Sequence, residues 1–131
     1  MTLNRSELRE KAMIILYQID ICKEQKMDVD VEEIIHNNLE IDNEFVKDIV
    51  FGVVTYKDEL DKIANKHMLD WSIDRLDKTG AAILEMAIYE LKYTDTPEVV
   101  VINEAIELSK KYSDDAVRKI INAVLDKVIK E

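Results

Sequence analysis

The stretch of sequence that decides the fold is Ala81-Ala82-Ile83-Leu84-Glu85-Met86-Ala87-Ile88-Tyr89-Glu90-Leu91. When it is wound into a helix, apolar side chains point in almost every direction, and a helix of that kind is buried. Asp77 lies just before it and has the short acceptor side chain that caps the first turn of a helix. We therefore expect a helix that begins after Asp77 and occupies the centre of a helical bundle.

The segments on both sides repeat apolar residues at three- and four-residue steps, which is the spacing of amphipathic helices. Toward the N-terminus they predict a helix that extends to Cys22, a short helix at 31–35 and a long helix that ends near His67. Toward the C-terminus they predict a helix that ends near Tyr112 and a last helix that includes 117–128. Short polar side chains suited to capping precede most of these segments, namely Asn4 or Ser6, Asp30, Asp42 or Asn43, Ser72 for a short turn, and Ser113 or Asp114.

Glycine and proline are scarce, with two glycines and one proline in 131 residues. Sheets need many turns that draw on these residues, so their scarcity favours long helices. Residues 99–102 have the composition of a strand but no obvious partner strand, and we interpret them as the entry to a helix. Gly52 falls inside a predicted helix, at a cost of about 1 kcal/mol relative to alanine, so we expect a close helix crossing there. The sequence predicts an all-α protein, a single domain at 1–131 with about six or seven helices.

The overall composition is that of a folded protein, with 47% hydrophobic and 35% charged residues. No apolar run approaches the roughly 20 residues of a membrane span, and the polar N-terminus has no apolar core of a signal peptide. Cys22 is the one cysteine, so no internal disulfide forms. From these features we expect a cytoplasmic protein that makes no contact with a membrane.

Charge is unevenly distributed along the chain, whose net charge is −10. Residues 1–27 sum to +1, residues 28–107 to −13 and residues 108–131 to +2. This asymmetry predicts one face suited to a polyanion and a separate face suited to a basic partner. An acidic surface that serves only solubility is the alternative explanation.

No pattern of catalytic or metal-binding residues is evident. Two isolated glycines exclude a glycine-rich phosphate loop. Glu33 and His36 form one Glu-x-x-His unit, but a di-iron bundle needs a second unit, and Ala64 stands where His67 would need its glutamate. We expect Cys22 to be a buried, inert thiol. The sequence therefore predicts a protein that binds rather than catalyses, without a metal or another cofactor.

Several sequence blocks resemble those of a known family when their order and spacing are taken together. The N-terminal block is Leu8-Arg9-Glu10-Lys11-Ala12-Met13-Ile14-Ile15-Leu16-Tyr17-Gln18-Ile19-Asp20. The C-terminal block is Val101-Ile102-Asn103-Glu104-Ala105-Ile106-Glu107-Leu108-Ser109-Lys110, followed by Ile120-Ile121-Asn122-Ala123-Val124-Leu125. With 45–54, 60–63 and 89–91 between them, these blocks resemble the NusB family of bacterial transcription antitermination factors. The resemblance implies an all-helical fold of two three-helix subdomains.

The resemblance also implies a function. The family binds the boxA element of nascent RNA as a heterodimer with NusE, a basic ribosomal protein of the small subunit. The complex joins other Nus factors on RNA polymerase and suppresses premature termination in ribosomal RNA operons. The charge distribution fits this function, since an acidic middle suits a basic partner and mildly basic ends suit RNA.

Candidate contact residues follow from matching this chain to the family. For RNA they are Arg5 and Arg9 near the N-terminus, the aromatic Tyr112, and the cations Lys111, Arg118 and Lys119 around the cap of the last helix. For the protein partner they are Asp74, Asp77 and Glu90. Each candidate also has a simpler role. Tyr112 would lie at the edge of the core, the cations of the last helix would face water, and the acidic residues would only cap helices or face water. Glu85 departs from the family, which frequently has arginine at this position.

Two other functions stay open at this point. A domain of this kind also occurs as the N-terminal part of an RNA cytosine methyltransferase, so the chain would then be a detached module of an RNA-modifying enzyme. The second alternative is an interaction scaffold that has lost RNA binding. The RNA sequence preferred and the choice between monomer and homodimer are open as well. For a composite RNA surface, the first helix and the cap of the last helix must lie side by side.

Overall fold

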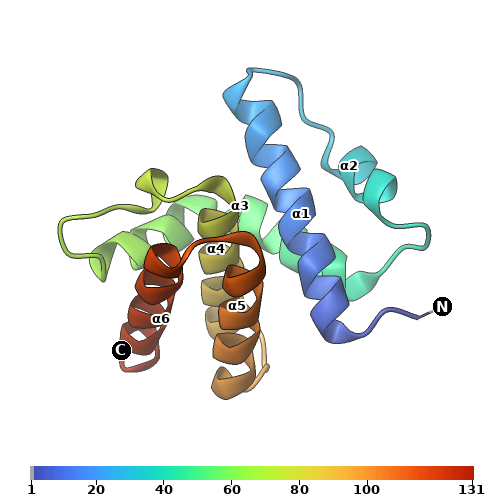
Figure 1. Cartoon of the computed structure of the whole chain (residues 1–131). Helices are drawn as coiled ribbons and strands as arrows, with labels where there is room; N and C mark the ends of the chain where they lie inside the picture. The colour runs from blue at the N-terminus through green and yellow to red at the C-terminus, as the bar shows by residue number, and fades with distance from the viewer. Residues whose placement is uncertain (1) are drawn as a thin grey trace.

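The computed structural model describes residues 2–131, which form six α-helices and one short 3₁₀ helix (Figure 1). In chain order these are α1 (Arg5–Glu24), α2 (Val31–Asn38), α3 (Glu44–Lys66), η1 (Ile73–Arg75), α4 (Lys78–Tyr93), α5 (Glu98–Tyr112) and α6 (Asp115–Ile129). The part of the chain that the structure describes contains no strand. The predicted all-α class and the helical reading of 99–102 are thus confirmed.

Helix starts are set by local hydrogen bonds, as the sequence indicated. Asn4 caps α1, and its side chain accepts from the Glu7 amide while the Glu7 carboxylate accepts from the Asn4 amide. This reciprocal pair satisfies two amides that the helix itself leaves free. At four later helices, a single cap side chain accepts from one amide of the first turn, namely Asp30, Asn43, Asp77 and Asp114. Ser72 makes no cap bond to η1, because its hydroxyl donates to the Asp74 carboxylate instead.

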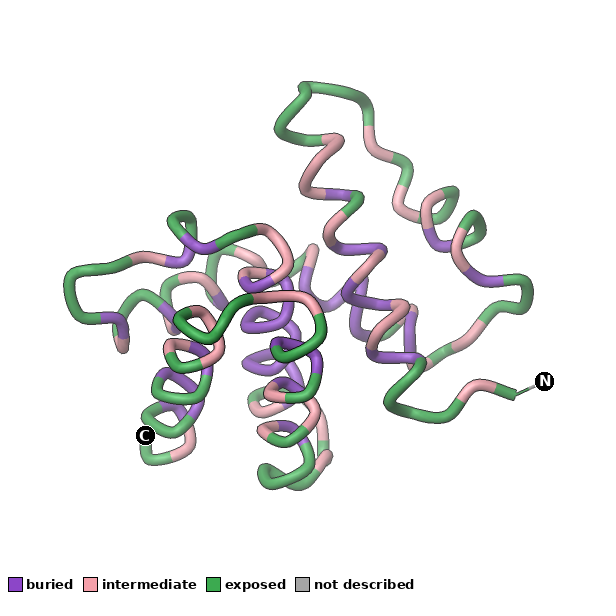
Figure 2. Tube along the Cα trace, viewed as in Figure 1, coloured by how far each residue is buried: buried purple, intermediate pink, exposed green. Residues whose placement is uncertain are grey.

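The predicted central helix is α4, which packs against α1, α3, α5 and α6. Residues 82–90 are all buried, including the carboxylates of Glu85 and Glu90. Figure 2 shows this continuous buried stretch, surrounded by helices that are buried on one side only. The apolar character of 81–91 therefore follows from its position, because every face of α4 meets another helix.

The halves of the chain meet where α3 crosses α4. Figure 1 shows α1 and α2 on one side of α4 and α6 on the other, with α3 behind them. Gly52 lies at the crossing, where a Cβ atom would overlap the Tyr89 ring. The close approach predicted from this glycine is confirmed. One turn later α3 kinks at Tyr56, whose φ of −104° and ψ of 17° are not helical.

Two further observations complete the fold. Cys22 is a free thiol and is partly exposed, whereas the sequence predicted a buried one. It lies near the end of α1, which extends beyond helices α3 to α6 in Figure 1. Within residues 2–131, no helix combines the length and the hydropathy that crossing a lipid bilayer requires.

Candidate nucleic-acid interface

The exposed start of α1 presents one of the two predicted arginines. The Arg5 guanidinium lies over the Phe45 ring, with Cζ 4.1 Å from the ring centroid. Arg9, one turn later, lies 5.1 Å from the same centroid, so both arginines share one flank of the helix. Sequence reasoning missed Phe45 as their common neighbour, because it follows them by 36 or more positions. The contact with the ring favours this orientation of Arg5 at the surface.

Arg9 and Glu90 form a buried ion pair. Arg9 Nε donates to Glu90 Oε1 at 2.9 Å and Nη2 donates to Oε2 at 3.1 Å. Arg9 is only 6% exposed and Glu90 only 3%, and Met86 and Val101 lie beside them. The sequence placed Arg9 on RNA and Glu90 on a partner protein, but each charge satisfies the other between α1 and α4. We therefore leave both residues out of the candidate surface.

Glu10 joins the end of α5 to α1. Its carboxylate accepts from Lys111 Nζ at 2.9 Å and from the Tyr112 hydroxyl at 2.6 Å. These two hydrogen bonds favour the ionised carboxylate and lower the pKa of Glu10, Tyr112 having the larger effect. The same bond raises the pKa of Tyr112. The turn before α6 follows directly, and its cap residue Asp114 lies two positions after Tyr112. The end of α5 therefore connects the first helix to the start of the last one.

The first turn of α6 carries the remaining predicted cations. Arg118 Nη2 pairs with the Asp115 carboxylate at 3.1 Å, whereas Lys119 is exposed. Asp114 caps the helix by accepting from the Val117 amide at 2.9 Å. The Asp114 carboxylate therefore already occupies the N-terminal end of α6, where the free amides would otherwise attract phosphate. Within residues 2–131, ion pairs within 4 Å include neither Lys119 nor Arg5.

The predicted partner-binding acids lie on the connection between α3 and α4. Asp74 is exposed in η1, and Asp77 caps α4 by accepting from the Gly80 amide at 2.7 Å. Asp77 also accepts from the Ser113 hydroxyl at 3.3 Å, which ties the start of α4 to the turn before α6. Asp77 thus lies next to the turn between the predicted cations Lys111 and Arg118, and not on a separate face.

Acidic residues also line the groove between α1 and α5. This groove of about 500 Å³ is lined by Glu7, Glu10, Glu104 and Glu107 together with Lys110 and Lys111. The Ser6 hydroxyl donates to Glu104 at 2.7 Å across it. Cations and anions are therefore interspersed at this end of the molecule, because α5 brings acidic side chains from the middle of the chain beside basic ones.

The comparisons with known proteins agree with the sequence blocks and with the fold. The model of the NusB family matches residues 6–130. This chain belongs to the NusB family. The transcription antitermination protein NusB of Macrococcus caseolyticus is 39% identical over 130 residues, which are 98% of each chain.

Solved NusB structures have the same arrangement of helices. T. maritima NusB matches with a TM-score of 0.86 and 28% identity, covering 100% of this chain and 94% of that one. A crystal structure of the antitermination factors NusB and NusE in complex with double-stranded RNA matches with a TM-score of 0.81 and 29% identity, covering 96% of both chains. The resemblance inferred from the sequence and the NusB-like fold are confirmed.

Proposed function

We propose that this chain is a transcription antitermination factor that binds boxA-type RNA together with NusE. The observation that carries the proposal is the likeness, over 96% of the chain, to the structure that contains NusB, NusE and RNA. The chain acts by binding and not by catalysis. Through NusE and RNA it contacts the other Nus factors and RNA polymerase, and its place of action is the cytoplasm.

RNA contacts at the surface come from Arg5, Lys111, Tyr112, Arg118 and Lys119. Arg5 has the planar fork that binds phosphate in two places, and the Phe45 ring orients it. Tyr112 offers a ring edge and face for an unpaired base, although its hydroxyl is held by Glu10. The neighbouring carboxylates oppose phosphate, so this chain alone binds RNA weakly. NusE, which is basic, supplies the missing cations.

The protein partner contacts the exposed carboxylates of Asp74 and Asp77. Both lie on the connection before α4, close to the turn that precedes α6. A basic protein seated there lies next to Ser113 and the cations beyond it. RNA can then contact both proteins at once, which accounts for a heterodimer that binds more tightly than either chain.

Fluorescence anisotropy with a labelled boxA-type RNA tests the RNA part of the proposal. We expect much tighter binding with NusE than without it, and a steeper loss of affinity with salt, since more phosphates are neutralised. Arg5→Glu weakens RNA binding by the heterodimer but leaves NusE binding unchanged. Lys23→Glu is the matched control, because it makes the same charge change at the exposed far end of α1.

Equal RNA affinity with and without NusE contradicts the proposal. If Arg5→Glu leaves RNA retention unchanged while NusE still binds, the scaffold alternative is supported instead.

Asp77→Asn tests the partner surface without disturbing the fold. Asparagine caps a helix as well as aspartate does, so α4 keeps its cap and the stability toward urea is unchanged. The charge is lost, and we expect NusE to bind more weakly in calorimetry. Asp126→Asn, which removes an exposed carboxylate near the end of α6, is the control. Identical NusE affinities for both variants would place the partner elsewhere.

A further inference from the structure

Three tyrosines from α3 and α4 form a stack that reaches the surface. Tyr93 lies between the other two rings, 5.4 Å from the Tyr89 centroid and 4.5 Å from the Tyr56 centroid. Tyr89 is buried, whereas Tyr93 is 41% and Tyr56 39% exposed. We call Tyr89, Tyr93 and Tyr56 the tyrosine stack. Large exposed aromatic side chains are more typical of binding surfaces than of solvated ones.

The helices that carry the stack hold it in place. Gly52 leaves room for the inner ring, because any larger side chain would overlap Tyr89. The kink of α3 falls at Tyr56, the outer ring. The Tyr89 hydroxyl donates to Asp48 at 3.0 Å, and the Tyr93 hydroxyl donates to both carboxylate oxygens of Glu59 at 2.7 Å. The rings are thus fixed before any ligand arrives, which lowers the entropy cost of binding.

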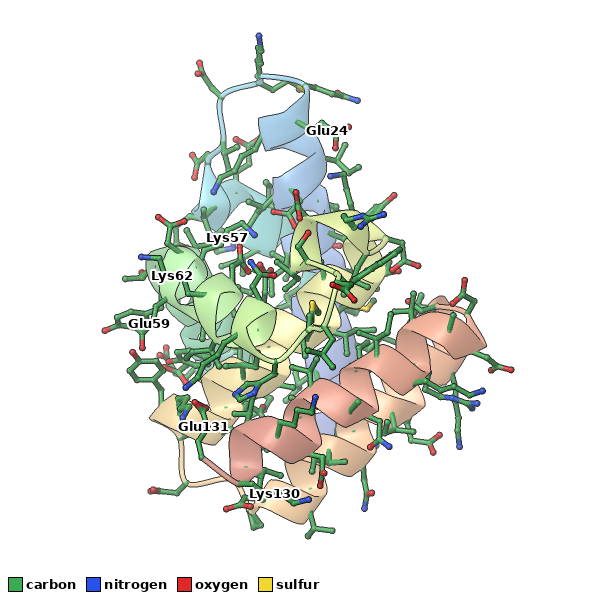
Figure 3. The ribbon with its side chains drawn as sticks, turned by 90° about the vertical axis from the view of Figure 1, so that its left-hand side faces the viewer. Glu24, Lys57, Glu59, Lys62, Lys130 and Glu131 are labelled. Atoms are coloured by element: carbon green, nitrogen blue, oxygen red, sulfur yellow. The ribbon has the colours of Figure 1, made fainter. Side chains whose placement is uncertain are left out.

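The charge around the stack favours a cation. Aromatic faces attract cations, and the exposed carboxylates of Asp48 and Glu59 lie at the edges of the rings. Lys92, next to Tyr93 in sequence, lies 3.6 Å from the Glu131 carboxylate. Figure 3 shows Glu59 on the outer side of α3, with Lys62 further along the same helix. Two carboxylates beside the rings disfavour a polyanion such as RNA.

The stack lies at the opposite end of α4 from the proposed NusE surface and from the start of α6. Asp77 caps the first end of α4, and Tyr93 is the last residue of the same helix. A helix of this length separates its ends by roughly 24 Å. The turn before α6 contacts Asp77, so the candidate RNA cations on α6 begin at that first end too. A ligand on the stack is therefore distinct from one seated at Asp77 and the start of α6. Arg5 lies nearer to the stack, because it contacts Phe45, three positions before Asp48 on α3.

We propose that the tyrosine stack, with Asp48 and Glu59, is a docking surface for an arginine-rich segment of a second protein. A guanidinium stacks on the outer Tyr56 ring, and its N–H groups donate to the Glu59 carboxylate. Arginine suits this site better than lysine because its planar group stacks and donates at the same time. This partner is additional to the RNA and NusE of the proposed function.

Nuclear magnetic resonance of the ¹⁵N-labelled full chain tests the proposal. The probes are synthetic peptides of five Arg-Gly, Lys-Gly or citrulline-Gly repeats, citrulline having the shape of arginine without its charge. We expect the Arg-Gly peptide to shift the amide signals of Tyr56, Glu59 and Tyr93. Affinity falls in the order arginine, lysine, citrulline. Removing both exposed rings with Tyr56→Leu and Tyr93→Leu weakens Arg-Gly binding about tenfold, since each exposed cation–π contact is worth a factor of about three.

Trp71→Leu is the matched control. Trp71 is as exposed, at 40%, but Arg75 already covers its ring at 4.1 Å, so its removal leaves affinity unchanged. If the double tyrosine variant does not fold, Glu59→Gln on the exposed side of α3 replaces it. About threefold weaker binding of the Arg-Gly peptide is then expected, because one exposed ion pair is lost. Equal affinity for the citrulline peptide, shifts confined to Asp74 and Asp77, or tighter binding of a uridine oligonucleotide to the same tyrosines would overturn the proposal.

Discussion

Substitution of Gly52 by alanine is the sharpest test of the packing between α3 and α4. The added Cβ atom would lie 2.6 Å from the Tyr89 hydroxyl oxygen and closer still to two ring carbons, whereas ordinary van der Waals contact begins at 3.4 Å. The ring must therefore retreat by roughly 1 Å within a close-packed interior. A retreat of this size separates Tyr89 from Asp48 and from the Tyr93 ring.

The expected free-energy change follows from three contributions. Alanine is a better helix former than glycine and stabilises α3 by about 1 kcal/mol. Overpacking costs about 2 kcal/mol. The lost hydrogen bond between Tyr89 and Asp48 costs about 1 kcal/mol more. We expect Gly52→Ala to lower the free energy of unfolding by about 2 kcal/mol.

Urea unfolding followed by far-ultraviolet circular dichroism measures this change, provided that the slope with denaturant is the same for both proteins. Thr55→Ala, at an exposed position on the same helix, serves as the control for helix propensity. In the Gly52→Ala background, Tyr89→Leu should lower the free energy of unfolding much less than it does in the wild type. The leucine side chain leaves room for the methyl group of the new alanine. A Gly52→Ala protein as stable as the wild type, or more stable, would refute the reasoning.

Three further outcomes are expected. Burial, reinforced by Asp61, raises the pKa of Glu85 to about 9 from an ordinary 4.5, so the folded state binds this proton more tightly and stability falls as the pH rises through that range. The free energy of unfolding of Glu85→Gln, measured with urea between about pH 5 and pH 9, should depend less on pH than that of the wild type. The same pH dependence in both proteins would contradict this expectation. Arg9→Met leaves a buried unpaired carboxylate and should lower the free energy of unfolding by about 3 kcal/mol or more. The double variant with Arg9→Met and Glu90→Met should recover most of that stability. Thermal unfolding of both variants measures the difference. Hydrogen bonds lower the pKa of Glu10, so the ionised carboxylate stabilises the fold, and this stabilisation is lost as the pH falls below 4.5. Tyr112→Phe removes the larger of these hydrogen bonds. The loss of stability in acid should then begin at a higher pH.

Local features of the fold were predictable because their causes lie within a few residues. A cap at Asp77 or Asp114 needs only an acceptor three positions before a free amide. The choice of Asn4 over Ser6 was left open by the sequence, since both have short polar side chains. The capping box with Glu7 decides it. Gly52 signalled a close crossing, but Tyr89 as the crossing residue came from the structure.

The candidate site was less predictable than the fold. Counting charges by segment suggested that basic and acidic faces are separate, because each segment was treated as one surface. The structure folds α5 beside α1, so Glu10 pairs with Lys111, more than 100 positions away in sequence. Glu85, which departs from the family, accepts a hydrogen bond from Lys57 of α3 at 2.6 Å. Neither pairing has a periodicity that marks it in advance.

By itself the sequence determined the all-α class, the order of the helices, the central position of α4 and the family. These depend on apolar periodicity, capping side chains and the order of motifs along the chain, and each acts over a few residues. Only the tertiary structure decided which charges face water. Arg9 and Glu90 look like surface residues in the sequence, but they lie 81 positions apart and become partners only when α1 crosses α4 and removes both from solvent.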